Sequence, residues 1–290
     1  MNGDYIFNIY RTVYYMFEKK YKLIKILGEG TFGKVYKGKN LRTNEYVAIK
    51  SVERKASSLK NEIKICNHLA NIKGIYKLRW YGSDLTYNYA VFDLLGPSLK
   101  EELREKGIYD YRTLVPIATQ IITIIEHIHK RGILHRDIKL ENFMLGLNDK
   151  DTIYLIDYGL SKSYLRSNEH IKKTINTNNI VGTTEYISPN VHEGMTPSRR
   201  DDLISVGYIF VHMLLGELPW KQLVNDKTII IYKQAILQQN TAYEIPNEIR
   251  EFLTIVNYLE YKDTPPYKQL QHTINNVIYN QPKLKEYPLI

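Results

Sequence analysis

The sequence predicts an α+β protein built from two lobes, a small antiparallel β lobe with one main helix and a larger, mainly α-helical lobe. Strand-like segments dominate residues 21–95, where only one segment has apolar residues at helical spacing. From residue 96 onward, long segments with apolar residues every three or four positions take over. A length of 290 residues suits one such bilobal unit. We therefore expect one domain over residues 21–285, divided into lobes at 21–95 and 96–285.

Composition narrows the class of protein. Hydrophobic residues make up 43% of the chain and charged residues 24%, which is typical of globular proteins and excludes disordered, collagen-like and fibrous chains. The net charge of +9 would suit nucleic-acid binding, but no dense run of six basic residues occurs. We expect the excess of lysine to be spread over a solvated surface, and we expect no nucleic-acid partner.

Cysteine usage and apolar segments indicate the cellular setting. Cys66 is the only cysteine, so an intramolecular disulfide is impossible, which favours a reducing compartment. The most apolar stretch, Leu203 to Leu215, is about 13 residues long, short of the roughly 20 that a membrane span needs. The N-terminus lacks the basic start of a signal peptide. We predict a monomeric intracellular protein, in the cytoplasm, the nucleus or both, with no membrane partner.

The small lobe follows a tyrosine-rich extension at residues 1–20. Its first strand ends in a glycine-rich segment, and its last strand stops at Gly96-Pro97. Between them, Leu59, Ile63 and Leu69 recur at helical spacing. The expected elements are strands at 21–27, 35–36, 46–49 and 87–95 and a helix at 58–69.

The large lobe contains helices with recognisable ends. Asp110 is a suitable N-cap for the first long helix, and Gly132 is a suitable terminator. Ser198 and Asp201 resemble a capping box at the start of the buried helix. The expected elements are helices at 111–131, 202–215, 228–239, 248–259 and 267–280, and a strand pair at 143–145 and 153–156. Residues 286–290 form a short end.

The glycine-rich segment Gly28-x-Gly30-x-x-Gly33 has two functional interpretations. In a dinucleotide-binding fold it would join a strand to a helix. Here Val35 and the residues after it are typical of a strand, which favours a hairpin. Glycines in a hairpin allow the backbone to approach a nucleotide's phosphates closely, although a purely structural hairpin would have the same sequence.

Lys50 lies on the third predicted strand, in Val-Ala-Ile-Lys. A lysine on a strand is usually exposed to solvent, but an ATP site needs one to hold the α- and β-phosphates, and a carboxylate to fix it. Glu62 on the following helix is our candidate for that carboxylate. Glu53 competes for this role, but it follows Lys50 so closely that we place it on the same strand.

The segment His135-Arg136-Asp137-Ile138-Lys139-Leu140-Glu141-Asn142, in a loop after a helix end, is the strongest signal in the chain. A phosphoryl acceptor hydroxyl needs a carboxylate that orients it and takes its proton, and Asp137 fits this role. Lys139 is close enough in sequence to reach the transferring phosphate. Asn142 offers a neutral oxygen for Mg²⁺. A chance loop with these residues at these offsets is improbable.

Asp157-Tyr158-Gly159 directly follows a predicted strand. Alone this triplet would be an ordinary turn. After the preceding motif, Asp157 is our candidate for the second metal ligand, which would bridge Mg²⁺ to the β- and γ-phosphates. Gly159 would allow the sharp turn.

These motifs, in this order over residues 21–285, resemble the protein-kinase signature. The resemblance implies the bilobal protein-kinase fold, ATP and Mg²⁺ as cofactors, and protein substrates. Lys139, together with Gly182-Thr183 before Tyr186, resembles the serine/threonine type rather than the tyrosine type. The expected acceptors are therefore serine and threonine hydroxyls.

The chain is similar in particular to the casein kinase 1 family. The similarity rests on Leu-Leu-Gly-Pro-Ser-Leu at 94–99, Ser-Pro-Asn at 188–190, Ser-Arg-Arg-Asp-Asp-Leu at 198–203 and Leu-Pro-Trp at 218–220. It implies that Asp202 braces the catalytic loop, with Phe92 at the gatekeeper position and Asp93 to Leu95 as the hinge that meets the adenine. The nucleotide contacts that the resemblance implies are Leu27, Gly28, Glu29, Gly30, Thr31, Phe32, Gly33, Lys34, Val35, Ala48, Lys50, Glu62, Phe92, Asp93 and Leu95.

The chain departs from that family where substrates bind. The family has a basic cluster before the tyrosine that matches Tyr232, and this sequence has Thr228 and Ile229–Ile231 there. Glu185 replaces a family arginine. The sequence therefore leaves open whether acidic or pre-phosphorylated sites are preferred.

Together the motifs predict an active ATP-dependent serine/threonine protein kinase. One alternative is a catalytically inactive pseudokinase scaffold, which the presence of every required residue type disfavours. The other is a basic nucleic-acid-binding protein, for which no basic stripe with interleaved aromatic residues is found. In the family that the chain resembles, the arginine matching Arg136 often pairs with a phosphate on the activation segment, and Ser163, Thr174 and Thr177 are candidate sites for it. That family generally works without such a phosphate. We therefore expect basal activity without an upstream kinase.

Overall fold

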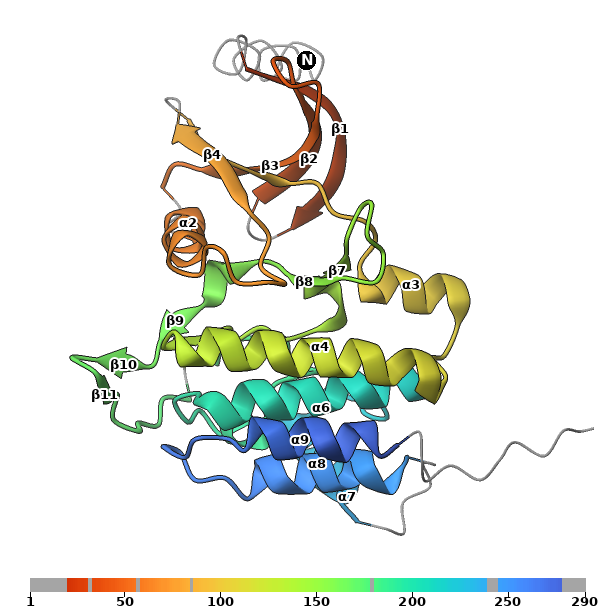
Figure 1. Ribbon diagram of the computed structural model, residues 1–290. Coiled ribbons are helices and arrows are strands. Elements are labelled where there is room, and N and C mark those ends of the chain that lie inside the picture. Colours follow the sequence, from red (N-terminus) through yellow and green to blue (C-terminus); the bar gives the residue numbers. More distant parts are fainter. Residues whose placement is uncertain are drawn as a thin grey trace, which may run out of the picture.

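The structure, a computed structural model, describes residues 20–30, 33–55, 58–83, 86–177, 180–238 and 245–277. It has the two predicted lobes, a β-sheet lobe and a helical lobe stacked beneath it in Figure 1. Residues 1–19 of the expected extension and the short end at 286–290 lie outside the described part of the chain. So do two predicted nucleotide contacts, Thr31 and Phe32.

The small lobe is built around one five-stranded antiparallel sheet of order β1-β2-β3-β5-β4. Helix α2 (Ser58–His68) connects β3 to β4 and packs against β4 and β5. The strands are β1 (Tyr21–Gly30), β2 (Gly33–Asn40), β3 (Tyr46–Glu53), β4 (Leu78–Ser83) and β5 (Tyr87–Asp93).

Side chains of β5 alternate between the two faces of the sheet, as the pleat requires. Tyr89 and Val91 belong to a small cluster on the outer face. Ala90 and Phe92 point the other way and belong to the main core, which continues through α2 into the helical lobe. Strand β5 is therefore buried on both faces.

The helical lobe is centred on two long helices, α4 and α6. Helix α4 packs against α6 and α9, and α6 also packs against α8 (Figure 1). Asp110 caps α4 as predicted, since its carboxylate accepts the N–H of Thr113 at 2.8 Å. The helices are α3 (Leu99–Lys106), α4 (Tyr111–Lys130), α5 (Pro189–His192), α6 (Arg199–Leu215), α7 (Asp226–Ala235), α8 (Asn247–Asn257) and α9 (Tyr267–Asn275).

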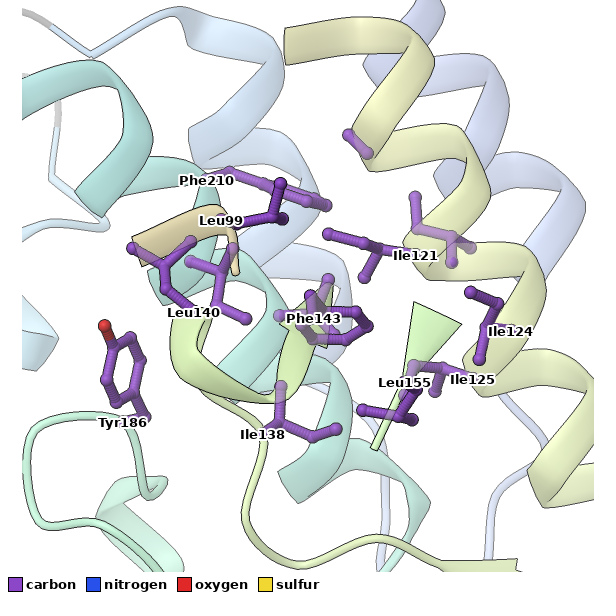
Figure 2. Close-up of a cluster of buried hydrophobic side chains, with 14 of the residues drawn as sticks. Leu99, Ile121, Ile124, Ile125, Ile138, Leu140, Phe143, Leu155, Tyr186 and Phe210 are labelled. Carbon is purple, nitrogen blue, oxygen red and sulfur yellow. The ribbon is translucent and has the colours of Figure 1, made fainter. Parts of the chain in front are cut away.

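The loop that carries the predicted catalytic residues is anchored in this core. Ile138 and Leu140 lie among Ile121, Phe143 and Leu155 in the buried cluster shown in Figure 2. These apolar residues alternate with Asp137 and Lys139, so the buried neighbours fix the backbone from which the polar side chains project. Strands β7 (Phe143–Leu145) and β8 (Ile153–Leu155) form the predicted antiparallel pair.

Several elements differ from the sequence predictions. Strand β4 and helix α3 were not predicted. Two short strand pairs occur in and around the segment that we expected to be a polar loop. Helix α7 starts at Asp226, before the expected Thr228, because the Asn225 side chain accepts the N–H groups of Lys227 and Thr228 at 2.9 and 3.3 Å. The two short pairs are β6 (Ile133–Leu134) with β9 (Lys162–Ser163) and β10 (Leu165–Arg166) with β11 (Glu169–His170).

Within the described ranges, no helix is both long enough and apolar enough to cross a bilayer.

Candidate active site

The glycine-rich segment is a hairpin between antiparallel strands, which excludes the strand-to-helix turn of a dinucleotide-binding fold. Gly33 has a φ of 108°, and a Cβ atom there would lie 2.2 Å from the carbonyl oxygen of Ser51 on β3. Only glycine fits this position. At Gly28 and Gly30, by contrast, a Cβ atom would meet no described atom within 4 Å. The glycines thus keep one side of the hairpin bare of side chains.

The rim of this hairpin carries opposite charges. Lys34 Nζ lies 3.0 Å from Glu29 Oε1, and both side chains are largely exposed. Leu27 is exposed at the end of the same strand, and Val35 pairs with Gly28 across the hairpin. The described members of the predicted phosphate loop therefore lie on one hairpin.

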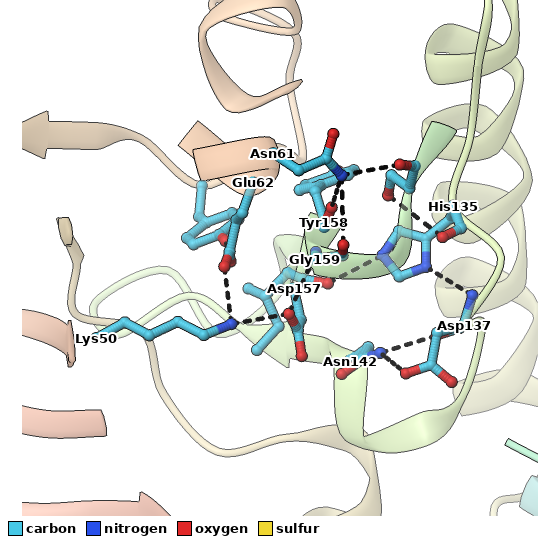
Figure 3. A network of polar contacts seen from close by, with 12 residues as sticks. Lys50, Asn61, Glu62, His135, Asp137, Asn142, Asp157, Tyr158 and Gly159 are labelled. Atoms are coloured by element: carbon cyan, nitrogen blue, oxygen red, sulfur yellow. Dashed lines mark hydrogen bonds and ion pairs between the residues drawn. The ribbon is translucent and has the colours of Figure 1, made fainter. Parts of the chain in front are cut away.

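Lys50 is held between two carboxylates, one from each lobe. Its Nζ lies 2.7 Å from Glu62 Oε2 on α2 and 2.9 Å from Asp157 Oδ1 after β8 (Figure 3). Burial alone would lower the pKa of the Lys50 amine, but the two carboxylates raise it above its ordinary value. Burial would also raise the pKa of Asp157, yet the Lys50 ammonium more than offsets this and lowers it. Glu53 ends strand β3 and is exposed, so the partner of Lys50 is Glu62.

Asp137 lies at the centre of a second polar network. Its Oδ2 is 2.8 Å from Lys139 Nζ, and its Oδ1 accepts the hydroxyl of Thr183 at 2.7 Å. Lys139 Nζ is also 3.2 Å from Thr183 Oγ1. The Asn142 amide nitrogen donates to the Asp137 backbone carbonyl at 2.8 Å and to its carboxylate at 3.3 Å. The three predicted residues of this loop are therefore together, with Thr183 added to them.

The backbone of the loop at 135–142 is braced by Asp202 from α6. Its two carboxylate oxygens accept the N–H groups of His135 at 2.8 Å and Arg136 at 2.9 Å, and His129 Nε2 lies 3.0 Å from one of them. Arg136 has a φ of 67°, a left-handed conformation that these hydrogen bonds hold in place. Burial alone would raise the pKa of Asp202, but the hydrogen bond and charge of His129 and the N–H of Arg136 lower it overall.

His135 joins the loop at 135–142 to the Asp157 segment. Its Nδ1 accepts the N–H of Asp137 at 3.3 Å, so its Nε2 carries hydrogen and donates to the Ile156 carbonyl at 3.0 Å. The backbone N–H of Asp137 and the residue before Asp157 are thus tied to one buried ring (Figure 3).

The sequence was matched to a known protein family. The family model of the protein kinase domain matches residues 21–280. The chain belongs to the protein kinase family. Membership of this family supports protein kinase activity. In general it also implies that the protein uses ATP and a divalent metal and acts on protein substrates.

Two oxygens of this kinase are suited to a divalent metal. The side-chain nitrogen of Asn142 donates hydrogen bonds, so its Oδ1 could bind a metal. Asp157 contacts Lys50 through Oδ1, so its Oδ2 could bind the same metal. Among the described residues, no group of three or more histidine, cysteine, aspartate or glutamate side chains could hold a metal alone. Two oxygen ligands fit a Mg²⁺ ion whose remaining positions go to phosphates and water.

Several predicted nucleotide contacts of the kinase lie on two neighbouring strands of the sheet. Ala48 on β3 is directly opposite Phe92 on β5, and Lys50 is opposite Ala90. Phe92 is buried and packs against the Tyr76 ring with a centroid separation of 4.4 Å. The Asp93 carboxylate forms an ion pair with Arg79.

The hinge residue Leu95 lies just beyond β5. It is partly buried against the main core. The sequence therefore brings Ala48, Phe92 and Leu95 into the region between the sheet and the helical lobe.

Sequence reasoning missed two residues that support this site. The Tyr76 hydroxyl donates to Glu62 Oε1, which occupies the carboxylate oxygen that Lys50 does not use. Asn61 on α2 donates its amide to the Ser161 carbonyl at 2.9 Å and to those of Tyr158 and Gly159 at 3.3 Å (Figure 3). Neither residue lies in a recognisable motif, so only the fold reveals these contacts.

Proposed function

We propose that this kinase is catalytically active and transfers the γ-phosphoryl group of ATP to serine and threonine hydroxyls of protein substrates. The observation that carries the proposal is a connected set of contacts across both lobes. Lys50 contacts Asp157, Asn142 contacts Asp137, and His135 joins the Asp137 backbone to the residue before Asp157. Residues 21–95 and 96–285 are proposed as its two lobes.

Asp137 is the proposed proton acceptor. The substrate hydroxyl would donate to this carboxylate, whose orientation Thr183 and Lys139 fix through its two oxygens. As the hydroxyl oxygen forms its bond to the γ-phosphorus, the bond from that phosphorus to the bridging oxygen breaks, ADP leaves with the electron pair, and the proton passes to Asp137. Lys139 offsets charge on the phosphoryl oxygens during this transfer.

Lys50 is the proposed anchor for the α- and β-phosphates. Its ammonium is already oriented by Glu62 and by Asp157, so little reorganisation is needed when phosphates bind. Asn142 and Asp157 would hold Mg²⁺ through their free oxygens. Bound there, the metal would neutralise charge on the β- and γ-phosphates. The Gly28–Gly33 hairpin would cover the phosphates, and Asp93 to Leu95 would meet the adenine.

A casein kinase 1-like identity is proposed on a contact between two of the motifs. Asp201 of the Ser-Arg-Arg-Asp-Asp-Leu motif accepts the hydroxyl of Ser188 at 2.6 Å and the amide of Asn190 at 3.2 Å. Its other oxygen accepts the N–H of Ser198 at 2.7 Å, which completes the capping box of α6. The Ser-Pro-Asn and Ser-Arg-Arg-Asp-Asp-Leu motifs thus act as one structural unit.

Transfer of labelled phosphate to casein, with Mg²⁺ and ATP, tests the proposal. Active kinase should label serine and threonine in casein, and Asp137→Asn, purified in parallel, should not. A folded wild-type chain that binds ATP but transfers nothing would favour the pseudokinase scaffold. Labelling on tyrosine alone would retain the kinase and remove the serine/threonine assignment.

A further inference from the structure

The side chain of Lys233, on α7, is buried beneath the segment that follows Thr183. Its exposed fraction is 1%. The Nζ atom donates to the Thr184 carbonyl at 2.9 Å and to the Ile187 carbonyl at 2.7 Å, and it lies 3.0 Å from His192 Nε2. No described carboxylate lies within ion-pair distance of it. This lysine therefore contacts backbone carbonyls rather than a counter-charge.

Two further side chains complete the same pattern. The Trp220 indole N–H donates to the Glu185 carbonyl at 2.7 Å, and the Ser205 hydroxyl donates to the Tyr186 carbonyl at 2.7 Å. Four consecutive carbonyls, from Thr184 to Ile187, are thus held by side chains rather than by strand or helix partners. We call residues 184–187 the clamped segment.

The contacts of His192 bear on the charge of Lys233. His192 Nδ1 lies 3.2 Å from Asp226 Oδ1, which is within ion-pair distance but does not have hydrogen-bond geometry. Burial and then the charge of Lys233 lower the pKa of His192 to about 4, which keeps this ring neutral near neutral pH. A neutral His192 ring can accept at Nε2, and Lys233 in its charged form supplies one N–H for this nitrogen and one for each of the two carbonyls.

A buried ammonium is costly to desolvate, and several groups around it offset that cost. The rings of Tyr208 and Trp220 have their centroids 5.2 and 5.5 Å from Nζ, within cation–π range. Asp226 and Glu185 also favour the charged form. Burial nevertheless prevails and lowers the pKa of Lys233 to about 7.

The clamped segment begins next to the catalytic carboxylate. Thr183 directly precedes it and donates to Asp137 Oδ1 at 2.7 Å. Any shift of the segment would move the Thr183 hydroxyl relative to Asp137 and Lys139. None of the Lys233 contacts involves Lys50, Asn142 or Asp157.

We propose that Lys233 is a positioning residue, which fixes the clamped segment and through it aligns Thr183 and the acceptor segment of the protein substrate with Asp137. The proposal rests on the proposed function, because it takes Asp137 as the group that receives the substrate hydroxyl. The proposal makes different predictions for the two substrates. Contacts to the protein substrate should depend on Lys233, whereas contacts to ATP should not.

The test uses the full chain with Lys233→Met, Lys233→Arg and the matched control Lys227→Met, which removes an exposed lysine from the same helix. We expect Lys233→Met to raise KM for a casein-derived peptide, or lower kcat for it, by about tenfold or more, since charged hydrogen bonds are lost. KM for ATP should stay within about twofold in every variant. Lys233→Arg should recover part of the loss, because it keeps the charge and the donors.

Two outcomes would overturn the proposal. One is a folded Lys233→Met variant with unchanged peptide kinetics. The other is an equal loss toward ATP and peptide, which would indicate a general structural defect. If Lys233→Met does not fold, Lys233→Gln, which keeps two N–H donors without charge, is judged by the same criteria.

A measurement without turnover separates this proposal from the proposed function. Amide hydrogen exchange at residues 184–187 should be faster in Lys233→Met than in wild type and unchanged in Lys227→Met. Equal exchange in wild type and Lys233→Met would contradict the clamp. If wild type itself transfers no phosphate, the proposed function fails, while exchange and peptide binding still decide the role of Lys233.

The pH profile gives a readout that packing alone would not change. Loss of a proton from Lys233 removes one of its three donors, so peptide KM in wild type should rise as the pH increases above about 7. The guanidinium of Lys233→Arg does not titrate there, so this rise should be absent. A rise of the same size in both proteins would count against Lys233 as its origin.

Discussion

Thr183 donates its hydroxyl to Asp137 Oδ1 at 2.7 Å. Lys139 contacts the other oxygen of the same carboxylate at 2.8 Å, so both oxygens are fixed before a substrate arrives. A carboxylate that is held at both oxygens cannot rotate freely, and it presents a defined direction to an incoming hydroxyl. The alignment of Asp137 therefore depends on the segment after β11 as well as on its own loop.

Thr183→Ala should lower kcat for peptide phosphorylation by about tenfold or more, because a hydrogen bond to a charged group is lost at the reacting centre. Thr183→Ser keeps the hydroxyl and should retain most of the activity. Steady-state kinetics with peptide and ATP varied separately measure both variants. Equal activities for the alanine and serine variants would mean that the hydroxyl is not needed.

Asp137→Asn should reduce turnover at least about a hundredfold while ATP binding stays largely intact, since the amide cannot take the substrate proton. Nucleotide affinity, measured by fluorescence of a labelled ATP analogue, checks that the site is still assembled. Near-normal activity in this variant would refute the proposed role of Asp137.

Lys50→Met should weaken both function and stability. It removes the proposed phosphate anchor and leaves Glu62 buried beside Tyr76 without its positive partner. Breaking a buried ion pair from one side costs about 3–5 kcal/mol of unfolding free energy. Urea denaturation measures this loss, and Lys60→Met, an exposed lysine of α2, should change stability little. Equal stability of the two variants would contradict the structural pairing.

Asp202 should make the fold sensitive to acid. Its pKa in the folded chain lies below the ordinary value of 3.8, so the unfolded chain binds its proton more readily. The ionised Asp202 carboxylate therefore stabilises the folded chain fully well above pH 3.8. This stabilisation is lost as the pH falls through the lower pKa that Asp202 has in the folded chain. Asp202→Asn should therefore be less stable than wild type near neutral pH, and this difference in unfolding free energy should shrink in acid. A difference independent of pH would contradict this prediction.

Arg136 bears on regulation. Its guanidinium Nε donates to the Leu160 carbonyl at 2.7 Å, so the side chain has a structural contact without any phosphate. We expect basal activity without an upstream kinase, and phosphatase treatment should leave peptide phosphorylation unchanged. Loss of activity after that treatment, restored by incubation with an activating kinase, would show that the prediction is wrong.

The contact between Lys50 and Glu62 was easier to predict from the sequence than the helices and strands around it. The pairing of Lys50 with Glu62 was predicted from the order of the motifs, because an ATP site needs a strand lysine and a carboxylate that fixes it. Tyr76 and Asn61 could not be predicted, since their contacts depend on tertiary packing. Tyr76 contacts Glu62 from the chain before β4, and Asn61 reaches the segment after Asp157.

The missed elements have weak local signals. Strand β4 alternates between partly buried and exposed residues at the edge of the sheet, where Tyr81 faces solvent. Helix α3 buries only Leu99 and Leu103. Its capping box joins Ser98, which lies in the 94–99 motif that we interpreted for its family resemblance, to Glu101 beyond that motif. Short, mostly polar elements owe their stability to tertiary packing rather than to periodicity.

The isoleucine run before Tyr232 shows why a linear comparison is incomplete. We treated Ile229–Ile231 as one replacement for a basic substrate-binding cluster. Ile229 and Ile231 point to different sides of helix α7, because residues two positions apart lie on different faces of a helix. Ile229 is therefore 2% exposed, whereas Ile231 is 62% exposed. Only part of this run is therefore available to a substrate.

The buried cluster on the inner face of the sheet continues through α2 into the helical lobe, whereas the outer face buries only a few side chains of its own. The two lobes are thus coupled thermodynamically, and a stabilising ligand bound near Lys50 would protect α6 and α8 from unfolding as well. Loss of packing at α2 would likewise weaken the whole enzyme rather than only its smaller half.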